Sequence, residues 1–299
     1  MDSNTDRAKS LVSIMKLKRF FRVSLLILAS LLVVISVFAQ FGLKMRKSDK
    51  EVLETFRIAN VPLEFRTVGT GDNIVHYAVT GSDTLPTLLF VHGSPGSWDA
   101  FEGYLLDADL RKKFRIISLD RPGFGYSNFG EARSLKENTA LCYQVYQAEY
   151  MGKPIHIIGH SIGGPVVLDL AQTHSVAFAS ISILAGSISG KYEAPEKWRL
   201  PFVAVPLRFL VPGALRVSND EIWMFKKELA GLDSGYGNLQ IPVYFIHGDA
   251  DPLVPVGNAY FGMEKLEGSG LGHIEIIEGA NHFIPWEHFD LIKKHLLQL

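Results

Sequence analysis

The stretch PIHIIGHSIGGPVVLDLAQT, residues 154–173, is the most informative part of this 299-residue chain. Pro154–Ile158 is a short apolar run typical of a buried strand, and Ile162–Thr173 has the composition of a helix. Between them, residues 159–163 (GHSIG) match the pattern G-x-S-x-G, in which a strand turns sharply into a helix and exposes a serine. Side chains at 159 and 163 would collide with neighbouring backbone in such a turn. We therefore expect Ser161 at a sheet edge and a helix N-terminus, where negative charge is favoured. The alternative is a serine that merely caps a helix.

Strands and helices alternate from about residue 62 to the C-terminus. Leu63–Val68 and Asn73–Val79 are expected to form an antiparallel pair joined by a turn at 69–72. Buried strands are expected at Pro86–Val91, Phe114–Leu119, Ile155–Ile158, Phe178–Leu184, Ile241–Ile246 and Ile274–Ile277. Helices are expected at Ser134–Met151, Ile162–Thr173 and Trp286–Leu297. This alternation predicts an α/β fold, a three-layer α/β/α sandwich with a mostly parallel sheet.

One segment interrupts the alternation. Residues 187–238 contain no convincing core strand, and four prolines stand there among large apolar residues. We interpret the segment as a small, mostly helical cap inserted over the sheet. The alternative, a long irregular connection, is uncommon at this length in compact domains.

A serine hydroxyl needs a base to take its proton, and a histidine base needs an acid to orient it. His282 lies in the sequence GANHF between the last expected strand and the last helix, so it is the candidate base. Asp251 follows the strand Ile241–Ile246 and is the candidate acid; Asp249 competes with it but is expected to form a turn. The order Ser, Asp, His along the chain suits this architecture. His160 and His247 flank these motifs and are expected to be loop residues.

An oxyanion formed at the serine needs two backbone N–H donors. We expect one from Ile162, directly after the serine, and one from Ser94 in the loop HGSPGS, residues 92–97, because Pro95 has no N–H. His92 is expected to brace this loop.

Five motifs in this order resemble the α/β-hydrolase superfamily, in the group with a serine nucleophile and a His-Gly-x-Pro loop. They are HGSPGSW at 92–98, DRPGFGYS at 120–127, GHSIGG at 159–164, GDADPLVP at 248–255 and NHFIPWEH at 281–288. The resemblance covers about residues 62–299. It implies hydrolysis of an ester, thioester, amide or carbon–carbon bond without a cofactor, a structural role for loop 120–127, and a place for Trp98 in the pocket lining.

Ser161 distinguishes the chain from the epoxide hydrolases and haloalkane dehalogenases that it resembles in the HGSP loop, because those enzymes place Asp at this turn. The expected cap is rich in large apolar residues, which favours an ester with a hydrophobic, lipid-derived chain. The leading hypothesis is a serine esterase that works through an acyl-enzyme on a small-molecule ester. An acyltransferase of the same fold and a low-turnover ligand-binding sensor are the alternatives.

Composition argues against a nucleic acid or a strongly anionic surface as the principal partner. Hydrophobic residues make up 47% of the chain and charged residues 20%, with a net charge of −1, so a nucleic-acid partner is not expected. The single cysteine, Cys142, cannot form an internal disulfide. No Cys/His cluster has metal-ligand spacing, so no metal site is expected.

An uncharged segment near the N-terminus, residues 23–43 (VSLLILASLLVVISVFAQFGL), is long enough to span a bilayer. It divides the chain into a basic cytoplasmic tail (1–22), a transmembrane anchor (23–43), a juxtamembrane linker (44–61) and the hydrolase domain (62–299). The linker is expected to hold a helix over Ser48–Phe56 with Val52, Leu53 and Phe56 on one side. Basic residues are slightly more numerous before this segment than after it. This difference favours a single-pass protein whose N-terminus is cytoplasmic and whose hydrolase domain is extracytoplasmic. A cleaved signal peptide followed by secretion, and a buried core helix, are the alternatives.

Overall fold

An eight-stranded sheet forms the centre of the protein, which we describe from a computed structural model covering residues 3–205 and 207–299. The strands are β1 Glu64–Val68, β2 Val75–Thr80, β3 Thr87–Val91, β4 Arg115–Leu119, β5 Ile155–His160, β6 Ser180–Leu184, β7 Val243–Gly248 and β8 Gly272–Ile277. Their order across the sheet is β1-β2-β4-β3-β5-β6-β7-β8. Only the pairs β1–β2 and β2–β4 are antiparallel, so the predicted mostly parallel sheet is confirmed.

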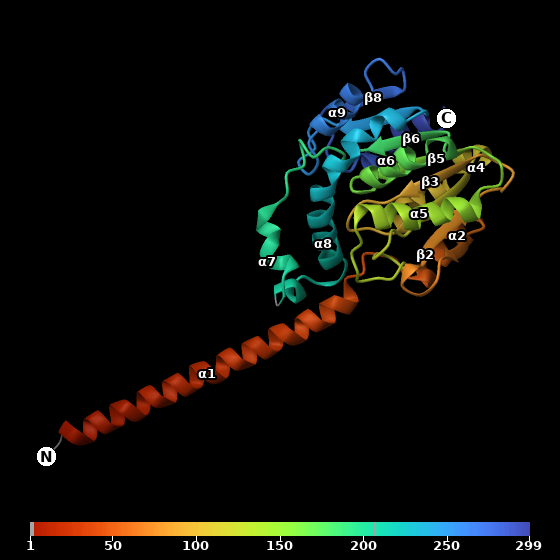
Figure 1. Ribbon diagram of the computed structural model, residues 1–299. Coiled ribbons are helices and arrows are strands. Elements are labelled where there is room, and N and C mark those ends of the chain that lie inside the picture. The colour runs from red at the N-terminus through yellow and green to blue at the C-terminus, as the bar shows by residue number, and fades with distance from the viewer. Residues whose placement is uncertain (1–2, 206) are drawn as a thin grey trace.

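Helices cover both faces of the sheet, as the alternating side chains of its strands require (Figure 1). In β3, Leu89 and Val91 pack in one core with α5 and α6, while Leu88 and Phe90 pack in a second core with α2, α3 and α11. The helices of these layers are α2 Asp49–Ile58, α3 Glu102–Leu106, α4 Ala108–Lys113, α5 Leu135–Glu149, α6 Gly163–Thr173, α9 Gly257–Lys265, α10 Ile284–Glu287 and α11 Phe289–Leu296. Both layers leave the carboxyl ends of the parallel strands free to carry a site.

Several expected elements differ in detail. The helix expected over Trp286–Leu297 is divided at His288, whose φ of −118° and ψ of 38° lie outside the helical region. Ser48 caps α2 by accepting the N–H of Glu51, and Val52 and Phe56 are buried, but Leu53 is exposed, contrary to expectation. The helices α3, α4 and α9 were not predicted, because they are short and pack only a few apolar residues on the sheet.

Residues between β6 and β7 are folded as helices and 3-10 turns, with no strand among those that the structure describes. The elements are η4 Lys197–Arg199, α7 Leu200–Val203, η5 Leu207–Leu210, α8 Gly213–Glu228, η6 Leu229–Ser234 and η7 Tyr236–Asn238. We call this inserted segment the cap. Its longest helix, α8, buries Val217 and Phe225 and lies over the edge of the sheet where the parallel strands end (Figure 1).

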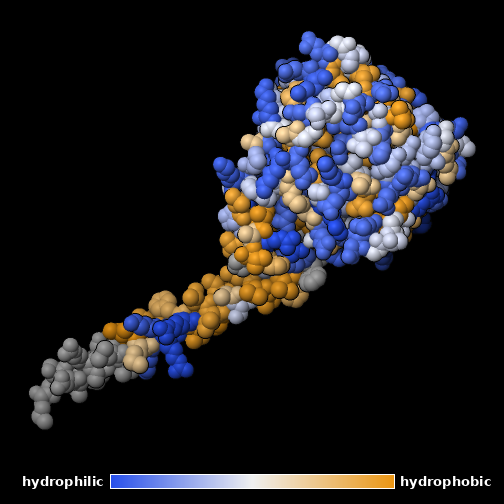
Figure 2. Space-filling view, in the orientation of Figure 1, coloured by the Kyte–Doolittle hydropathy of each residue, from blue (hydrophilic) through white to orange (hydrophobic). Residues whose placement is uncertain are grey.

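The N-terminal helix α1, Ser3–Gly42, projects from the body as a long rod (Figure 1). Its segment Ile14–Phe38 has a mean hydropathy of 2.5 and is wholly unburied, as the hydrophobic surface in Figure 2 shows. By length and composition this helix can cross a membrane; a signal sequence meets the same criteria. The helix continues through residue 22, so the predicted boundary between tail and anchor is not a break in secondary structure.

Candidate active site

Ser161 occupies a sharp turn between β5 and α6. Its φ is +55°, a left-handed conformation that is uncommon for a residue other than glycine. A Cβ atom on Gly159 would lie 2.4 Å from the carbonyl oxygen of Gly163, and one on Gly163 would lie 2.3 Å from that of Val91. The expectation that both positions exclude side chains is therefore confirmed. The turn holds Ser161 at the carboxyl end of β5, with α6 directly behind it.

His282 and Asp251 meet at the same edge of the sheet. The Nδ1 atom of His282 lies 2.7 Å from Oδ2 of Asp251, whose side chain is fully buried. The other carboxylate oxygen accepts the N–H groups of Leu253 at 2.8 Å and Val254 at 2.9 Å. Burial alone raises the pKa of Asp251, but hydrogen bonds from His247, His282 and the Val254 N–H outweigh it and hold the pKa well below its usual value. Asp251 is thus an ionised acceptor beside the imidazole.

Asp249, the competing carboxylate, does not contact His282. It is exposed and accepts the N–H of Gly279 at 2.7 Å, so its side chain joins two loops that are distant in the sequence instead of closing the local turn that we expected. The geometry therefore separates the two carboxylates that the sequence left in competition.

Two histidines that were expected in loops are instead buried at the ends of strands. His160 is the last residue of β5, and its Nε2 lies 3.1 Å from the carbonyl oxygen of His282. Burial, together with the nearby His282, lowers the pKa of His160 to about 3, so it is neutral and positions the backbone of His282. His247, in β7, donates to the carbonyl oxygen of Val254 at 2.9 Å and lies 3.4 Å from Asp251. The expectation failed because both residues extend the strand by one or two positions beyond the apolar run.

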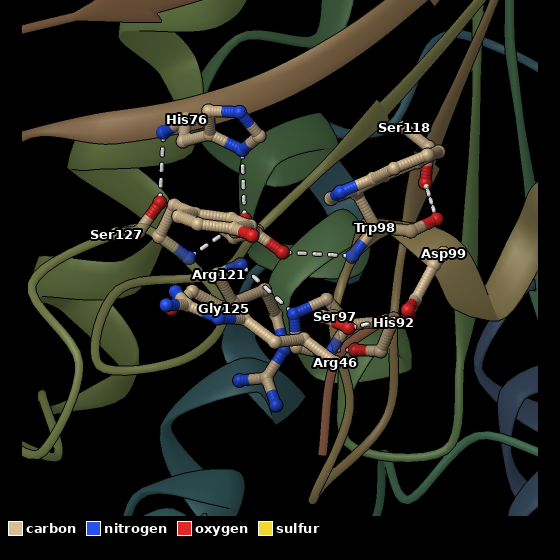
Figure 3. Close-up of polar contacts among 12 residues, drawn as sticks. Arg46, His76, His92, Ser97, Trp98, Asp99, Ser118, Arg121, Gly125 and Ser127 are labelled. Atoms are coloured by element: carbon tan, nitrogen blue, oxygen red, sulfur yellow. Dashed lines mark hydrogen bonds and ion pairs between the residues drawn. The ribbon is translucent and has the colours of Figure 1, made fainter. Parts of the chain in front are cut away.

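Ser94 and Ile162, the predicted oxyanion donors, line the same cavity as Ser161 and His282. Within the part of the chain that the structure describes, neither backbone N–H donates to a protein acceptor. His92 braces the loop as expected. Its Nε2 accepts the N–H of Arg121 at 2.9 Å, so the ring proton sits on Nδ1, which donates to the carbonyl oxygen of Gly93 at 2.6 Å (Figure 3).

Arg121 is a residue of the site that the sequence analysis missed. Its fully buried guanidinium donates to the carbonyl oxygens of His92 at 2.7 Å and Gly93 at 3.0 Å. The same group pairs with Glu221 of α8, which is also fully buried, with one N–O distance of 2.9 Å. Arg121 thus connects the cap to the loop that carries Ser94. The signal was present as a charged residue in the motif DRPGFGYS, but its partner lies 100 positions away.

Asp120, next to Arg121, organises the loop 120–127. Its carboxylate accepts the N–H of Trp98 at 2.8 Å and that of Tyr126 at 2.9 Å, and it contacts Nδ1 of His76 at 2.8 Å. Ser127 continues the network by accepting the N–H of His76 (Figure 3). These contacts support the structural role that the resemblance implied for this loop.

Trp98 does not line the cavity, which corrects the expectation based on the resemblance. Its ring is buried in the core, with ring centroids 6.4 Å from Phe56 and 5.4 Å from Phe65, and its carbonyl oxygen accepts the hydroxyl of Ser118. The indole fills space beneath the HGSP loop because Asp120 holds the Trp98 backbone there.

The cavity itself has a volume of about 900 Å³ and lies between the sheet edge and the cap. Its wall combines Ser161 and His282 with apolar side chains of the cap, chiefly Phe202, Val211, Leu215 and Ile222. Met45, three residues after α1, also lines it, which the sequence analysis did not anticipate. Among the described residues, no group of three or more His, Cys, Asp or Glu side chains is arranged to hold a metal ion. The wall also includes the charged residues Glu193, Glu196, Arg199 and Lys226.

Comparison with known proteins agrees with this geometry. A family model described as alpha/beta hydrolase fold matches residues 86–210. The chain is 25% identical to an uncharacterized protein of Mycobacterium tuberculosis (strain ATCC 25618 / H37Rv), over 80% of this chain and 82% of that protein. It is 23% identical to monoacylglycerol lipase abhd6-B of Xenopus laevis, over 68% of this chain and 71% of that protein.

The fold also matches solved structures. The esterase RhEst1 from Rhodococcus sp. ECU1013 superposes with a TM-score of 0.58 at 22% identity, covering 78% of this chain and 98% of that chain. The sheet order, the serine turn and the family match lead to one assignment: this chain has the alpha/beta hydrolase fold.

Proposed function

We propose that this protein is a serine hydrolase that cleaves a carboxylic ester with an apolar chain through an acyl-enzyme. Ser161 is the nucleophile, His282 the general base and acid, and Asp251 the residue that orients His282. The observation that carries this proposal is the 2.7 Å contact between Asp251 and His282 at the cavity that Ser161 lines.

The proposed mechanism follows from the position of the imidazole proton. Because ionised Asp251 can only accept, its contact with Nδ1 keeps the proton on that nitrogen and leaves Nε2 as an acceptor. Nε2 then takes the proton of Ser161 as the serine oxygen attacks the ester carbonyl, and returns it to the leaving alcohol. Water repeats the two steps on the acyl-enzyme and releases the acid.

The N–H groups of Ile162 and Ser94 are proposed to stabilise the oxyanion. Both residues line the cavity, and the contacts of Arg121 with the carbonyl groups of His92 and Gly93 hold the loop of Ser94 in place. Loss of one such donor typically lowers kcat by about 10²–10³-fold.

The apolar wall of the cavity supports a hydrophobic, lipid-derived acyl ester as the substrate. The name of the Xenopus laevis relative, monoacylglycerol lipase, points in the same direction. A series of p-nitrophenyl esters of rising chain length tests this part of the proposal. We expect kcat/KM to rise with chain length, and a clear preference for acetyl esters would refute it.

We further propose that α1 anchors the protein in a membrane and that the hydrolase domain lies outside the cytoplasm. In this arrangement residues 1–22 form the cytoplasmic tail, 23–43 the anchor, 44–61 the linker and 62–299 the domain with its cap at 187–238. The exposed apolar surface of α1 supports the anchor. Alkaline phosphatase fused to the C-terminus should be active, and an inactive fusion would place the domain in the cytoplasm. A mature protein that begins after Ala39 would indicate a cleaved signal peptide instead.

A fluorophosphonate probe tests the activated serine directly. We expect rapid labelling of the wild-type protein and none of Ser161→Ala, with both proteins showing the same thermal unfolding. Absence of labelling in the folded wild-type protein would favour a ligand-binding sensor. Transfer of the acyl group to an added alcohol in preference to water would favour an acyltransferase.

A further inference from the structure

We propose that one face of the cap rests in the headgroup layer of the membrane that α1 crosses, so that the cavity opens to the lipid and its ester enters from the bilayer. The face consists of exposed apolar residues of the segment 198–210, and we call it the cap face: Trp198, Leu200, Val205, Leu207, Phe209 and Leu210. This inference rests on the membrane anchor and on the ester hydrolase activity proposed above.

The end of α1 is hydrogen-bonded to the cap. The side-chain amide of Gln40 donates to the carbonyl oxygens of Phe209 and Val211, each at 3.0 Å, and its oxygen accepts the N–H of Gly213 at 3.3 Å. The carbonyl oxygen of Leu43 accepts the N–H of Ala214 at 2.7 Å. The loop that follows η5 is therefore attached directly to the last turn of α1.

This attachment sets the height of the cap above the membrane. The uncharged segment 23–43 has 21 residues, which as a helix span about 31 Å at 1.5 Å per residue. The hydrocarbon core of a bilayer is about 30 Å thick, and each headgroup layer adds about 5–8 Å. Gln40 lies within one helical turn of the end of this segment, and Lys44 is the first charge after it. The backbone of Phe209 and Val211 must then lie close to the boundary between the hydrocarbon core and the headgroups.

The side chains at this level have the character of a membrane surface. Val205 is 73% exposed and Trp198 is 61% exposed, and the other members of the cap face are also exposed. Figure 2 shows hydrophobic surface on the part of the body that lies beside α1. Soluble proteins seldom expose a contiguous apolar patch of this kind, whereas tryptophan and aliphatic residues are common at the bilayer interface. The continuity of the patch with α1 identifies a lipid bilayer as its partner.

The mouth of the cavity borders the cap face. Besides Trp198, six large apolar residues both line the cavity and are exposed: Met45, Phe202, Leu215, Leu253, Phe283 and Trp286. Trp198 belongs to the cap face and to the cavity wall at once. An acyl chain leaving the bilayer would therefore meet apolar side chains from the membrane surface to the cavity of Ser161.

The linker holds the opposite side of the mouth close to the exit of α1. The carbonyl oxygen of Met45 accepts the hydroxyl of Ser97 at 3.0 Å, and the N–H of Lys47 donates to Asp99 at 2.6 Å. Arg46 donates to the carbonyl oxygen of Gly125 and lies 3.5 Å above the ring of Tyr126. Figure 3 shows Arg46, Ser97 and Asp99 close together at the end of the HGSP loop. Because the cap and the HGSP loop are both tied to residues 40–47, the cavity cannot turn away from the membrane without breaking these contacts.

Lipid quenching of a fluorophore tests the position of the cap face. The full chain carrying Phe209→Cys or Leu210→Cys is labelled with a thiol-reactive NBD dye and reconstituted in phosphatidylcholine vesicles that contain a spin-labelled lipid. The native Cys142 is buried, and burial raises its pKa to about 12, so it should not react. Val176→Cys is the matched control, since Val176 is 85% exposed but follows α6 at the opposite edge of the sheet.

We expect the spin-labelled lipid to quench the dye at 209 and 210 by at least about twofold and to leave the dye at 176 unchanged. Equal, weak quenching at all three positions would overturn the inference. The result does not depend on catalysis, so it remains interpretable even if the fluorophosphonate experiment refutes the serine hydrolase.

Kinetics test the route of the substrate. Replacing Leu207, Phe209 and Leu210 by Gln removes apolar side chains that do not line the cavity. We expect the rate on an ester embedded in vesicles to fall by about tenfold, while the rate on a water-soluble p-nitrophenyl ester stays within twofold of the wild type. An unchanged rate on the embedded ester would overturn entry from the bilayer.

Discussion

The substitution Asp251→Asn gives a sharp test of the proposed triad, because the structure predicts which atoms of the new side chain would face His282. Oδ1 of Asp251 accepts two backbone N–H groups, at 2.8 and 2.9 Å, so the carbonyl oxygen of the asparagine should remain there. The amide NH₂ would then take the place of Oδ2, which lies 2.7 Å from Nδ1 of His282. Because that NH₂ group can only donate, His282 would have to carry its proton on Nε2 and could no longer accept the proton of Ser161.

The expected loss is large. The corresponding change in a well-studied serine protease triad lowers kcat by about 10⁴-fold, for the same reason of tautomer. We expect kcat for a p-nitrophenyl ester to fall by about 10³–10⁴-fold here, equivalent to about 4–5 kcal/mol of transition-state stabilisation. Asp249→Asn is the matched control: it lies two residues away, is exposed and bonds only to the N–H of Gly279. Its kcat should remain within about threefold of the wild type.

Steady-state kinetics, with thermal unfolding as a check on the fold, measure both variants. Retention of more than about a tenth of the activity by Asp251→Asn would refute the assignment of the acid. So would an equal loss in the Asp249→Asn variant, which would indicate that the loop and not the carboxylate matters.

Three further predictions concern stability. Gly163→Ala should destabilise the fold by about 3 kcal/mol or more and abolish activity, because its Cβ would lie 2.3 Å from a backbone oxygen. Gly231→Ala is the control: its Cβ would have open space around it, so the free energy of unfolding should change by less than about 1 kcal/mol. Glu221→Gln should cost about 3–5 kcal/mol in denaturant unfolding, because it leaves the buried charge of Arg121 without its partner; a loss below 1 kcal/mol would contradict this. Burial lowers the pKa of His156 to about 4. Between about pH 6.5 and pH 4, His156 is therefore protonated in the unfolded chain but neutral in the native state. Stability falls as the pH is lowered through this range. The free energy of unfolding, measured by denaturant titration, should fall from pH 7 to pH 5 in the wild type. In His156→Gln this fall should be smaller by about 1–2 kcal/mol.

The fold was predictable from local sequence because its signals are local. Buried parallel strands such as Thr87–Val91 are continuous apolar runs, and the turn at Ser161 needs glycine two residues before and after it, so each is visible within a few positions. Strand ends were less predictable. His160 and His247 extend their strands because backbone hydrogen bonding to the neighbouring strand continues past the last apolar residue, a fact that polarity alone cannot reveal.

Pairings across the chain depended on tertiary structure. The sequence favoured Asp251 over Asp249 only through the expectation that Asp249 forms a turn, because contact with His282 depends on which side of the loop after β7 faces the loop after β8. Trp98 looked like a pocket residue, but the N–H bond from its backbone to Asp120 directs the ring into the core.

The order of the motifs and the periodicity of the apolar residues were sufficient to determine the α/β-hydrolase fold and the candidate residues Ser161, Asp251 and His282. Only the folded chain revealed that Arg121 pairs with Glu221 and that residues 40–47 join α1 to the cap and to the HGSP loop. The physical reason is that hydrophobic patterning reports on a few neighbouring residues, whereas buried ion pairs and backbone contacts between distant segments exist only once the cores have brought those segments together.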